Sequence, residues 1–104
     1  MTIVIPNLLL DGIVLAFIKE NSVYSRVITN RAKAIFGISE SVIYPVLRKL
    51  RQNGFLLIYT KPFQGKNRNY YQITALGKAE LKTIKKEWCS FSTKINQIMG
   101  EENE

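Results

Sequence analysis

Residues 37–56, GISESVIYPVLRKLRQNGFL, are the stretch that decides the fold. Ser39 is a suitable N-cap for a helix, and Gly54 suits the left-handed position that commonly follows a helix C-terminus. Between them, apolar side chains recur at the i, i+3, i+4, i+7 spacing of a helix with one buried face. These are Ile43, Val46, Leu47 and Leu50. The stretch therefore predicts a short helix with a single apolar stripe.

The opposite face of this helix carries hydroxyl, aromatic and cationic side chains, which suit a polyanion. They are Ser41, Tyr44, Arg48, Lys49, Arg51 and Gln52. Pro45 removes one helical hydrogen bond. Because Pro45 lies early in the helix, we expect a local distortion there and no break.

The formal net charge of +7 is concentrated around this helix. Residues 24–72 contain nine Lys and Arg residues against Glu40 alone, whereas residues 1–23 and 73–104 are nearly neutral. A basic centre between neutral flanks is the electrostatic footprint of a nucleic-acid-binding protein.

The composition excludes several functional classes. The 104 residues contain no histidine, so histidine-based triads and the usual zinc sites are absent. Cys89 is the single cysteine, which excludes an intramolecular disulfide and suits a reducing, cytoplasmic compartment. The six glycines are scattered and form no phosphate-binding loop. We therefore expect no enzymatic activity, no metal and no cofactor.

The most apolar segment is residues 8–18, LLLDGIVLAFI. It is shorter than the roughly 20 residues of a membrane-spanning helix. No Lys or Arg precedes it, whereas a signal peptide has a positively charged residue before its apolar run. We expect a helix over residues 7–19 that is buried on more than one side, partly by a partner subunit. Gly12 in this helix marks the close approach of a neighbouring element.

A second helix is expected over residues 22–36, with Ser22 as its cap and the glycine at position 37 as the turn into the next helix. Its apolar stripe comprises Val23, Val27, Ile28, Ala32 and Ile35. Two short helices joined across a glycine, the second of them basic, are typical of a helix-turn-helix.

Two β-favouring runs follow, FLLIYT at residues 55–60 and RNYYQI at residues 68–73, with KPFQGKN between them. Pro62 and Gly65 indicate a turn, and Lys61 and Lys66 make it basic. This pattern predicts a β-hairpin wing next to the basic helix. A wing that only closes the core is the alternative, and we favour one that contacts DNA.

The last helix is expected over residues 75–99, capped by Thr74. Its apolar positions are spaced 3, 4, 3, 4, 3, as in a helix that packs against another helix. They are Leu81, Ile84, Trp88, Phe91, Ile95 and Ile98. We favour dimerisation along this seam over packing on the same chain. The chain then divides into a winged helix-turn-helix domain at 1–74, a dimerisation helix at 75–99 and a disordered acidic tail at 100–104.

Taken together, these pieces resemble the PadR family of transcriptional regulators over nearly the whole chain. The motifs that carry the resemblance are LLLDGIVLAFIKE, GISESVIYPVLRKLRQNGFL, GKNRNYYQITALGKAEL and the tryptophan-bearing last helix. The single C-terminal helix is similar to that of the smaller subgroup, which includes regulators responding to toxic or multidrug compounds. The resemblance implies a mainly α fold with a small β-hairpin. It also implies a homodimeric repressor that a small aromatic ligand releases from a near-palindromic DNA operator.

Several positions depart from the family pattern. Ser41 and Val42 stand where a glycine and a threonine are usual, and Ser25 replaces a frequent glycine. In the wing, Lys66 replaces an arginine, so a point charge stands in place of a fork-shaped donor. These changes affect which operator is bound and leave the binding class unchanged.

The expected DNA-binding residues are Ser39, Ser41, Tyr44, Arg48, Lys49, Lys61, Lys66 and Arg68. The residues of the ligand site that the resemblance implies are Trp88, Phe17, Phe91 and Asp11, with Asp11 as a polar contact for a cationic ligand. A purely structural role for Trp88 in the dimer core is an equal alternative. Two other functions stay open: a winged-helix protein-interaction adaptor or anti-activator, and an RNA-binding protein that uses exposed aromatic side chains.

Overall fold

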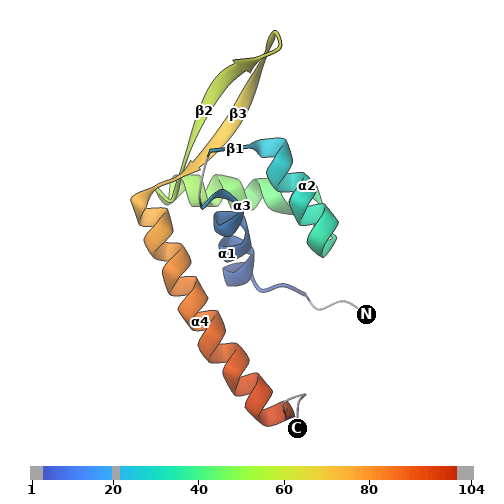
Figure 1. Ribbon diagram of the computed structural model, residues 1–104, viewed down its shortest axis with the longest axis vertical. Coiled ribbons are helices and arrows are strands. Elements are labelled where there is room, and N and C mark those ends of the chain that lie inside the picture. The colour runs from blue at the N-terminus through green and yellow to red at the C-terminus, as the bar shows by residue number, and fades with distance from the viewer. Residues whose placement is uncertain (1–3, 20–21, 101–104) are drawn as a thin grey trace.

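The computed structural model of the chain describes residues 4–19 and 22–100. It contains four helices and a three-stranded antiparallel sheet with strand order β1-β3-β2 (Figure 1). The elements are α1 (Asn7–Ile18), β1 (Val23–Tyr24), α2 (Ser25–Phe36), α3 (Glu40–Gln52), β2 (Leu56–Phe63), β3 (Lys66–Ile73) and α4 (Ala75–Met99). This mainly helical winged helix-turn-helix confirms the predicted fold class.

Helix α3 is the predicted basic helix, and its apolar stripe is buried as expected. Ser39 is its N-cap by backbone geometry, although the Ser39 hydroxyl is 2.8 Å from the Ser41 hydroxyl and caps no backbone N–H. At the other end Gly54 has a φ of 82°, and Phe55 N–H donates to the Leu50 carbonyl (2.9 Å). This pairing satisfies carbonyls that the helix end would otherwise leave without partners. The helix runs through Pro45 without a break.

The start of α2 differs from the prediction. Ser22 caps no helix, because Val23 and Tyr24 form the short strand β1, which pairs with Tyr71 and Tyr70 of β3. The helix begins only at Ser25, after Tyr24 as N-cap. β-Branched and aromatic side chains suit this pairing, which a helical spacing alone did not reveal.

The stripe predicted for α2 is only partly buried. Ile28 and Ala32 lie in the core, whereas Val27 and Ile35 are exposed. Thr29 is buried in their place, and its hydroxyl donates to the Arg26 carbonyl (3.1 Å). A local hydrogen bond of this kind lets a threonine occupy a core position.

The wing is longer than predicted. β2 and β3 pair along their full lengths, from Leu56 with Ile73 to Phe63 with Lys66. The turn is therefore only Gln64 and Gly65, both with positive φ, as in the tight turns that join twisted strands. Pro62 is accommodated because β2 is an edge strand.

The Thr74 side chain connects the beginning of α4 to the end of α3 through two hydrogen bonds. The Thr74 hydroxyl accepts from Gly77 N–H (2.9 Å), as predicted for a cap, and donates to the Gly54 carbonyl (2.7 Å). At Gly77 an added Cβ would lie 2.2 Å from the Phe55 carbonyl oxygen, so only glycine permits this approach. The hydroxyl therefore ties the end of α3 to the beginning of α4.

The seam of α4 is divided between two environments. Leu81 and Ile84 are buried in the chain's own core, and Ile84 packs against Gly12 of α1, the close approach predicted there. This corrects the expectation that all six seam positions serve dimerisation. Beyond them α4 leaves the domain, and Trp88, Phe91 and Ile98 are exposed (Figure 1). The predicted tail falls largely on residues 101–104, which lie outside the described residues.

Candidate nucleic-acid interface

The outward face of α3 is polar and basic. Tyr44 and Arg48 are both exposed, one turn apart. Next to them lies Tyr71 of β3, which is almost fully buried. Burial raises the pKa of the Tyr71 phenol above its ordinary value, while the positive charge of Arg51 opposes that rise and Tyr44 and Arg48 contribute less. Tyr71 thus joins the base of the wing to the basic face of α3.

Lys49 does not extend freely from this face. Its Nζ lies 2.8 Å from Asp11 Oδ1 and 2.9 Å from Oδ2, in the single ion pair found within residues 4–19 and 22–100. Asp11 belongs to α1, so the pair links α1 to α3. The structure therefore places Lys49 against a carboxylate, where the sequence predicted contact with the DNA backbone.

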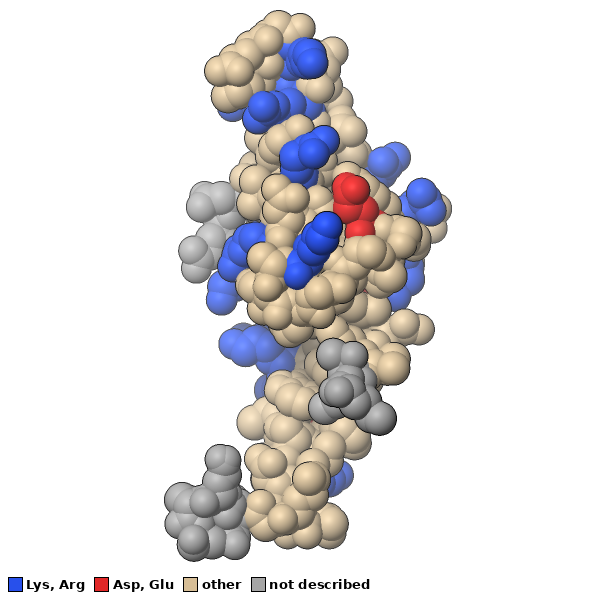
Figure 2. Space-filling view, turned by 90° about the vertical axis from the view of Figure 1, so that its right-hand side faces the viewer, with Lys and Arg blue, Asp and Glu red and all other residues tan. Residues whose placement is uncertain are grey.

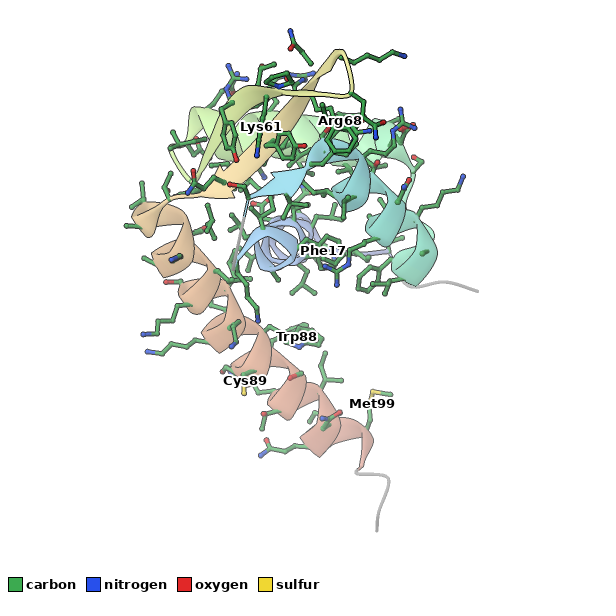
Figure 3. All side chains as sticks on the ribbon, turned by 45° about the horizontal axis from the view of Figure 1, so that its top comes forward. Phe17, Lys61, Arg68, Trp88, Cys89 and Met99 are labelled. Carbon is green, nitrogen blue, oxygen red and sulfur yellow. The ribbon has the colours of Figure 1, made fainter. Side chains whose placement is uncertain are left out.

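The outer face of the hairpin combines aromatic rings with cations. Tyr70 packs against Tyr24 and Tyr59, with centroid separations of 5.8 and 5.7 Å. Lys61 Nζ lies 5.9 Å from the centroid of the Tyr70 ring. The strand register places Arg68 opposite Lys61 on the same face, and both are labelled in Figure 3.

Near the tip of the wing, side chains of β1, α2 and the hairpin enclose a hollow of about 420 Å³. Three cations line it: Arg26 from the first turn of α2, and Lys66 and Arg68 from β3. Arg68 Cζ lies 3.9 Å from the centroid of Phe63 and 4.4 Å from that of Tyr24. The sequence did not predict Arg26 as a site residue, because its approach to Arg68 depends on the pairing of β1 with β3.

Cationic side chains extend from the wing over the domain on the face drawn in Figure 2, with acidic side chains at one place on it. The predicted residues of α3 and of the wing are therefore all on the surface. Arg68 is the partly buried member of the set, because it lies over two rings.

A second concave feature lies between α1 and α4. This groove has a volume of about 480 Å³. Its lining is mainly apolar and comes from α1, α2 and α4: Leu9, Gly12, Ile13, Ala16, Lys19, Phe36, Leu81, Ile84, Lys85 and Trp88. Trp88 thus lines a groove, as expected for a ligand contact, and Phe91 lies beside it with the ring centroids 6.4 Å apart.

Two residues of the predicted ligand site lie elsewhere. Phe17 packs under Arg31 of α2, whose guanidinium carbon is 4.5 Å from the ring centroid. Asp11 is engaged by Lys49. Neither Phe17 nor Asp11 lines the groove between α1 and α4. In Figure 3 Trp88 and Cys89 project from opposite sides of α4.

The described residues offer no group of three or more metal-ligating side chains of the His, Cys, Asp and Glu types. Within the same part of the chain, no helix has the length and apolar character needed to cross a membrane.

Comparison with known proteins agrees with this geometry. The family model described as "Transcriptional regulator PadR-like family" matches residues 14–83. A curated protein of Lysinibacillus sphaericus is 36% identical over 95 residues, which cover 86% of this chain and 87% of that protein.

Several solved structures are similar to this chain over most of its length. A Streptococcus mutans protein is 34% identical, with a TM-score of 0.86 over 95% of this chain and 93% of its own. A PadR-like transcriptional regulator of Bacillus cereus is 30% identical, with a TM-score of 0.79 over 90% of this chain and 94% of its own. Bacillus subtilis PadR, solved in complex with operator DNA, is 28% identical, with a TM-score of 0.67 over 75% of this chain and 47% of its own. Those relatives whose function is stated are transcriptional regulators, not enzymes.

Proposed function

The chain belongs to the PadR-like family of transcriptional regulators, and we propose that it is a homodimeric repressor that binds a near-palindromic DNA operator and is released by a small aromatic ligand. The single observation that carries this proposal is the basic outward face of α3 beside a basic wing. Among the described residues, the only ion pair on this surface engages Lys49 and leaves the other cations available.

Contact with duplex DNA is supported by the arrangement of α3. Its buried stripe fixes the helix on the core, so Ser41, Tyr44 and Arg48 project together from the other side. A helix of this kind fits the major groove, where an arginine can donate two hydrogen bonds to a guanine. Bacillus subtilis PadR, which is similar to this chain, was solved in complex with operator DNA, and this supports duplex DNA as the partner of this chain.

Dimerisation is supported by the apolar residues of α4 that the chain leaves uncovered. Phe91 is 57% exposed and Ile98 is 86% exposed, on the part of the helix that lies beyond the domain. Ile95 is half-buried on the same seam. Contiguous exposed apolar side chains on a long helix are typical of a subunit interface. A second copy would cover these residues and part of the α1–α4 groove.

A flat aromatic ligand fits the groove beside Trp88. The groove falls within the usual volume range of small-molecule sites and is lined mainly by apolar side chains. Stacking on the exposed indole ring would add to the hydrophobic contribution. Binding there would act on α1 and α4, the helices from which we expect the dimer to be built.

The alternative is a winged-helix adaptor or anti-activator that binds a protein and no operator. In that function the same basic face would contact an acidic partner. The two functions differ in their response to competing duplex DNA, which would displace an operator and leave a protein partner bound.

The experiment that tests the proposal measures binding of a labelled duplex selected by the protein from a random pool. We expect affinity to fall steeply with salt, and Arg48→Ala to weaken binding by about 1–3 kcal/mol. Single-stranded RNA should compete poorly. Sedimentation velocity at micromolar concentration should give a dimer. The proposal would be contradicted if binding did not depend on salt, or if the wild-type chain bound the duplex as a monomer.

The ligand is tested separately with the fluorescence of Trp88, the single tryptophan. Planar aromatic dyes should quench it and lower the affinity for the selected duplex. Ala16→Phe, which fills the groove from α1 without adding a second indole, should abolish quenching. Quenching that persists unchanged in this variant would place the ligand outside the groove.

A further inference from the structure

The hollow at the tip of the wing has the features of a built anion site. It is concave, it is lined by Arg26, Lys66 and Arg68, and no acidic side chain lines it. The three cations come from two elements that lie more than thirty residues apart in sequence, so only the folded chain brings them together.

Arg68 is held in place by two aromatic rings, one from each strand that neighbours β3. Its guanidinium carbon is within 4.5 Å of the centroids of Phe63 and Tyr24. A guanidinium whose face contacts a ring keeps its N–H donors at its edge, where they can form paired hydrogen bonds to an oxyanion. Much of the side-chain entropy that binding would cost has already been lost on folding.

We propose that this hollow binds one phosphate of the duplex DNA backbone, with Arg68 as the pre-oriented donor and Arg26 and Lys66 as flanking cations. A phosphate suits the site because it accepts paired hydrogen bonds from a fork-shaped donor and carries the charge that the three cations attract. The proposal rests on the proposed function, since it specifies how the wing contacts DNA. It also adds α2 to that contact through Arg26.

Lys61 provides an internal comparison. It lies on the same face of the hairpin but over the Tyr70 ring, and it does not line the hollow. If the wing attracted DNA only through its total charge, Lys61 and Arg68 would be equivalent. If the hollow holds a phosphate, the geometry of Arg68 matters in addition to its charge.

The test uses variants of the full chain that keep the charge and change the hollow. Phe63→Ser removes one ring from Arg68, and Arg68→Lys replaces the fork by a point charge. Leu57→Ser is the matched control, because Leu57 is an exposed apolar residue on the same strand and the same face, outside the hollow. Binding of the selected duplex is measured across a range of salt concentrations, and thermal denaturation reports whether each variant is folded.

We expect Phe63→Ser to weaken binding about two- to fivefold per subunit and Arg68→Lys about tenfold, while Leu57→Ser binds as the wild type does. Arg68→Gln should reduce the salt slope by about 0.9 per subunit, because the phosphate loses its main donor. Arg26→Gln should reduce the slope by less, and the double variant by no more than Arg68→Gln alone, because both residues contact the same phosphate. Lys82→Gln on α4 should leave the slope unchanged.

The outcomes separate this proposal from the proposed function. If the wild type does not bind duplex DNA, the proposed function fails. If the wild type binds while Phe63→Ser and Arg68→Lys bind equally well, or if Arg26→Gln and Arg68→Gln add in the salt slope, only the phosphate site is overturned. The DNA assignment is also overturned if these variants bind duplex normally while pyrophosphate raises the melting temperature of the wild type and not of Arg68→Gln, since the hollow would then hold a free phosphate.

Discussion

Asp11 of α1 and Lys49 of α3 form an ion pair in which Nζ lies within 3 Å of both carboxylate oxygens. The neighbouring residue Gly12 lines the α1–α4 groove, on another face of the same helix. One helix therefore contacts the proposed ligand site on one side and the proposed DNA-reading helix on the other. This arrangement connects the two sites through a single rigid element.

The ion pair predicts that Lys49 is not a phosphate contact. Lys49→Gln should leave the salt slope of duplex binding nearly unchanged, whereas Arg48→Gln should lower the affinity and Asp11→Asn, which frees Lys49, should steepen the slope. The effect on folding should stay below about 1 kcal/mol, because the Lys49 side chain is 46% exposed. If Lys49→Gln lowers the slope by about 0.9 per subunit, Lys49 leaves the carboxylate on binding and the prediction is wrong.

Thr74 should be important for stability. Thr74→Val keeps the shape of the side chain but removes both the cap of α4 and the hydrogen bond to the Gly54 carbonyl. We expect the free energy of unfolding to fall by about 1–2 kcal/mol in chemical denaturation. Thr74→Ser retains the hydroxyl and serves as the control. A loss in Thr74→Ser without one in Thr74→Val would show that packing of the methyl group, not the hydroxyl, is responsible.

Gly12 sets the distance between α1 and α4. A Cβ at this position would lie 2.8 Å from Ile84 Cγ2, so Gly12→Ala should push the helices apart and destabilise the chain by about 1–3 kcal/mol. Ile84→Ala removes the atom that clashes. The double variant should therefore be more stable than the sum of the two single losses predicts. Strict additivity in thermal or chemical denaturation would contradict the proposed contact.

Burial of Tyr71 predicts a change in stability at alkaline pH. The pKa of its phenol is raised in the folded chain above the ordinary value of 10.0. A raised folded-state pKa gives stability that is fully present below the unfolded-state pKa and is lost as the pH rises through the folded-state pKa. In denaturation measured at increasing pH, Tyr71→Phe should lose less stability above about pH 10 than the wild type. If the wild type and Tyr71→Phe lose stability equally as the pH rises, the Tyr71 phenol does not titrate with a raised pKa.

Much of the fold follows from sequence periodicity. The stripe of α3, the cap at Thr74 and the start of α4 depend on neighbours within four residues, and all three were predicted. The strand β1 was missed because a two-residue strand has no period of its own and exists only through its pairing with Tyr70 and Tyr71.

The sites were less predictable for the same reason. The spacing of charges placed Lys49 on the polar face of α3, but its partner Asp11 lies 38 residues away in sequence. Likewise, the resemblance implied a ligand site that includes Phe17, yet Arg31 covers this ring from α2. Contacts between residues so far apart in sequence depend on how the helices pack, which a local sequence pattern does not indicate.

The central claim is that two copies of this chain read duplex DNA together through their α3 helices. Hydroxyl-radical footprinting of the wild-type protein on its selected duplex tests it most directly. We expect two protected regions on one face of the DNA, with centres one helical turn or about 34–36 Å apart, and loss of both in Arg48→Ala. A single protected region, or protection that Arg48→Ala leaves intact, would contradict the claim.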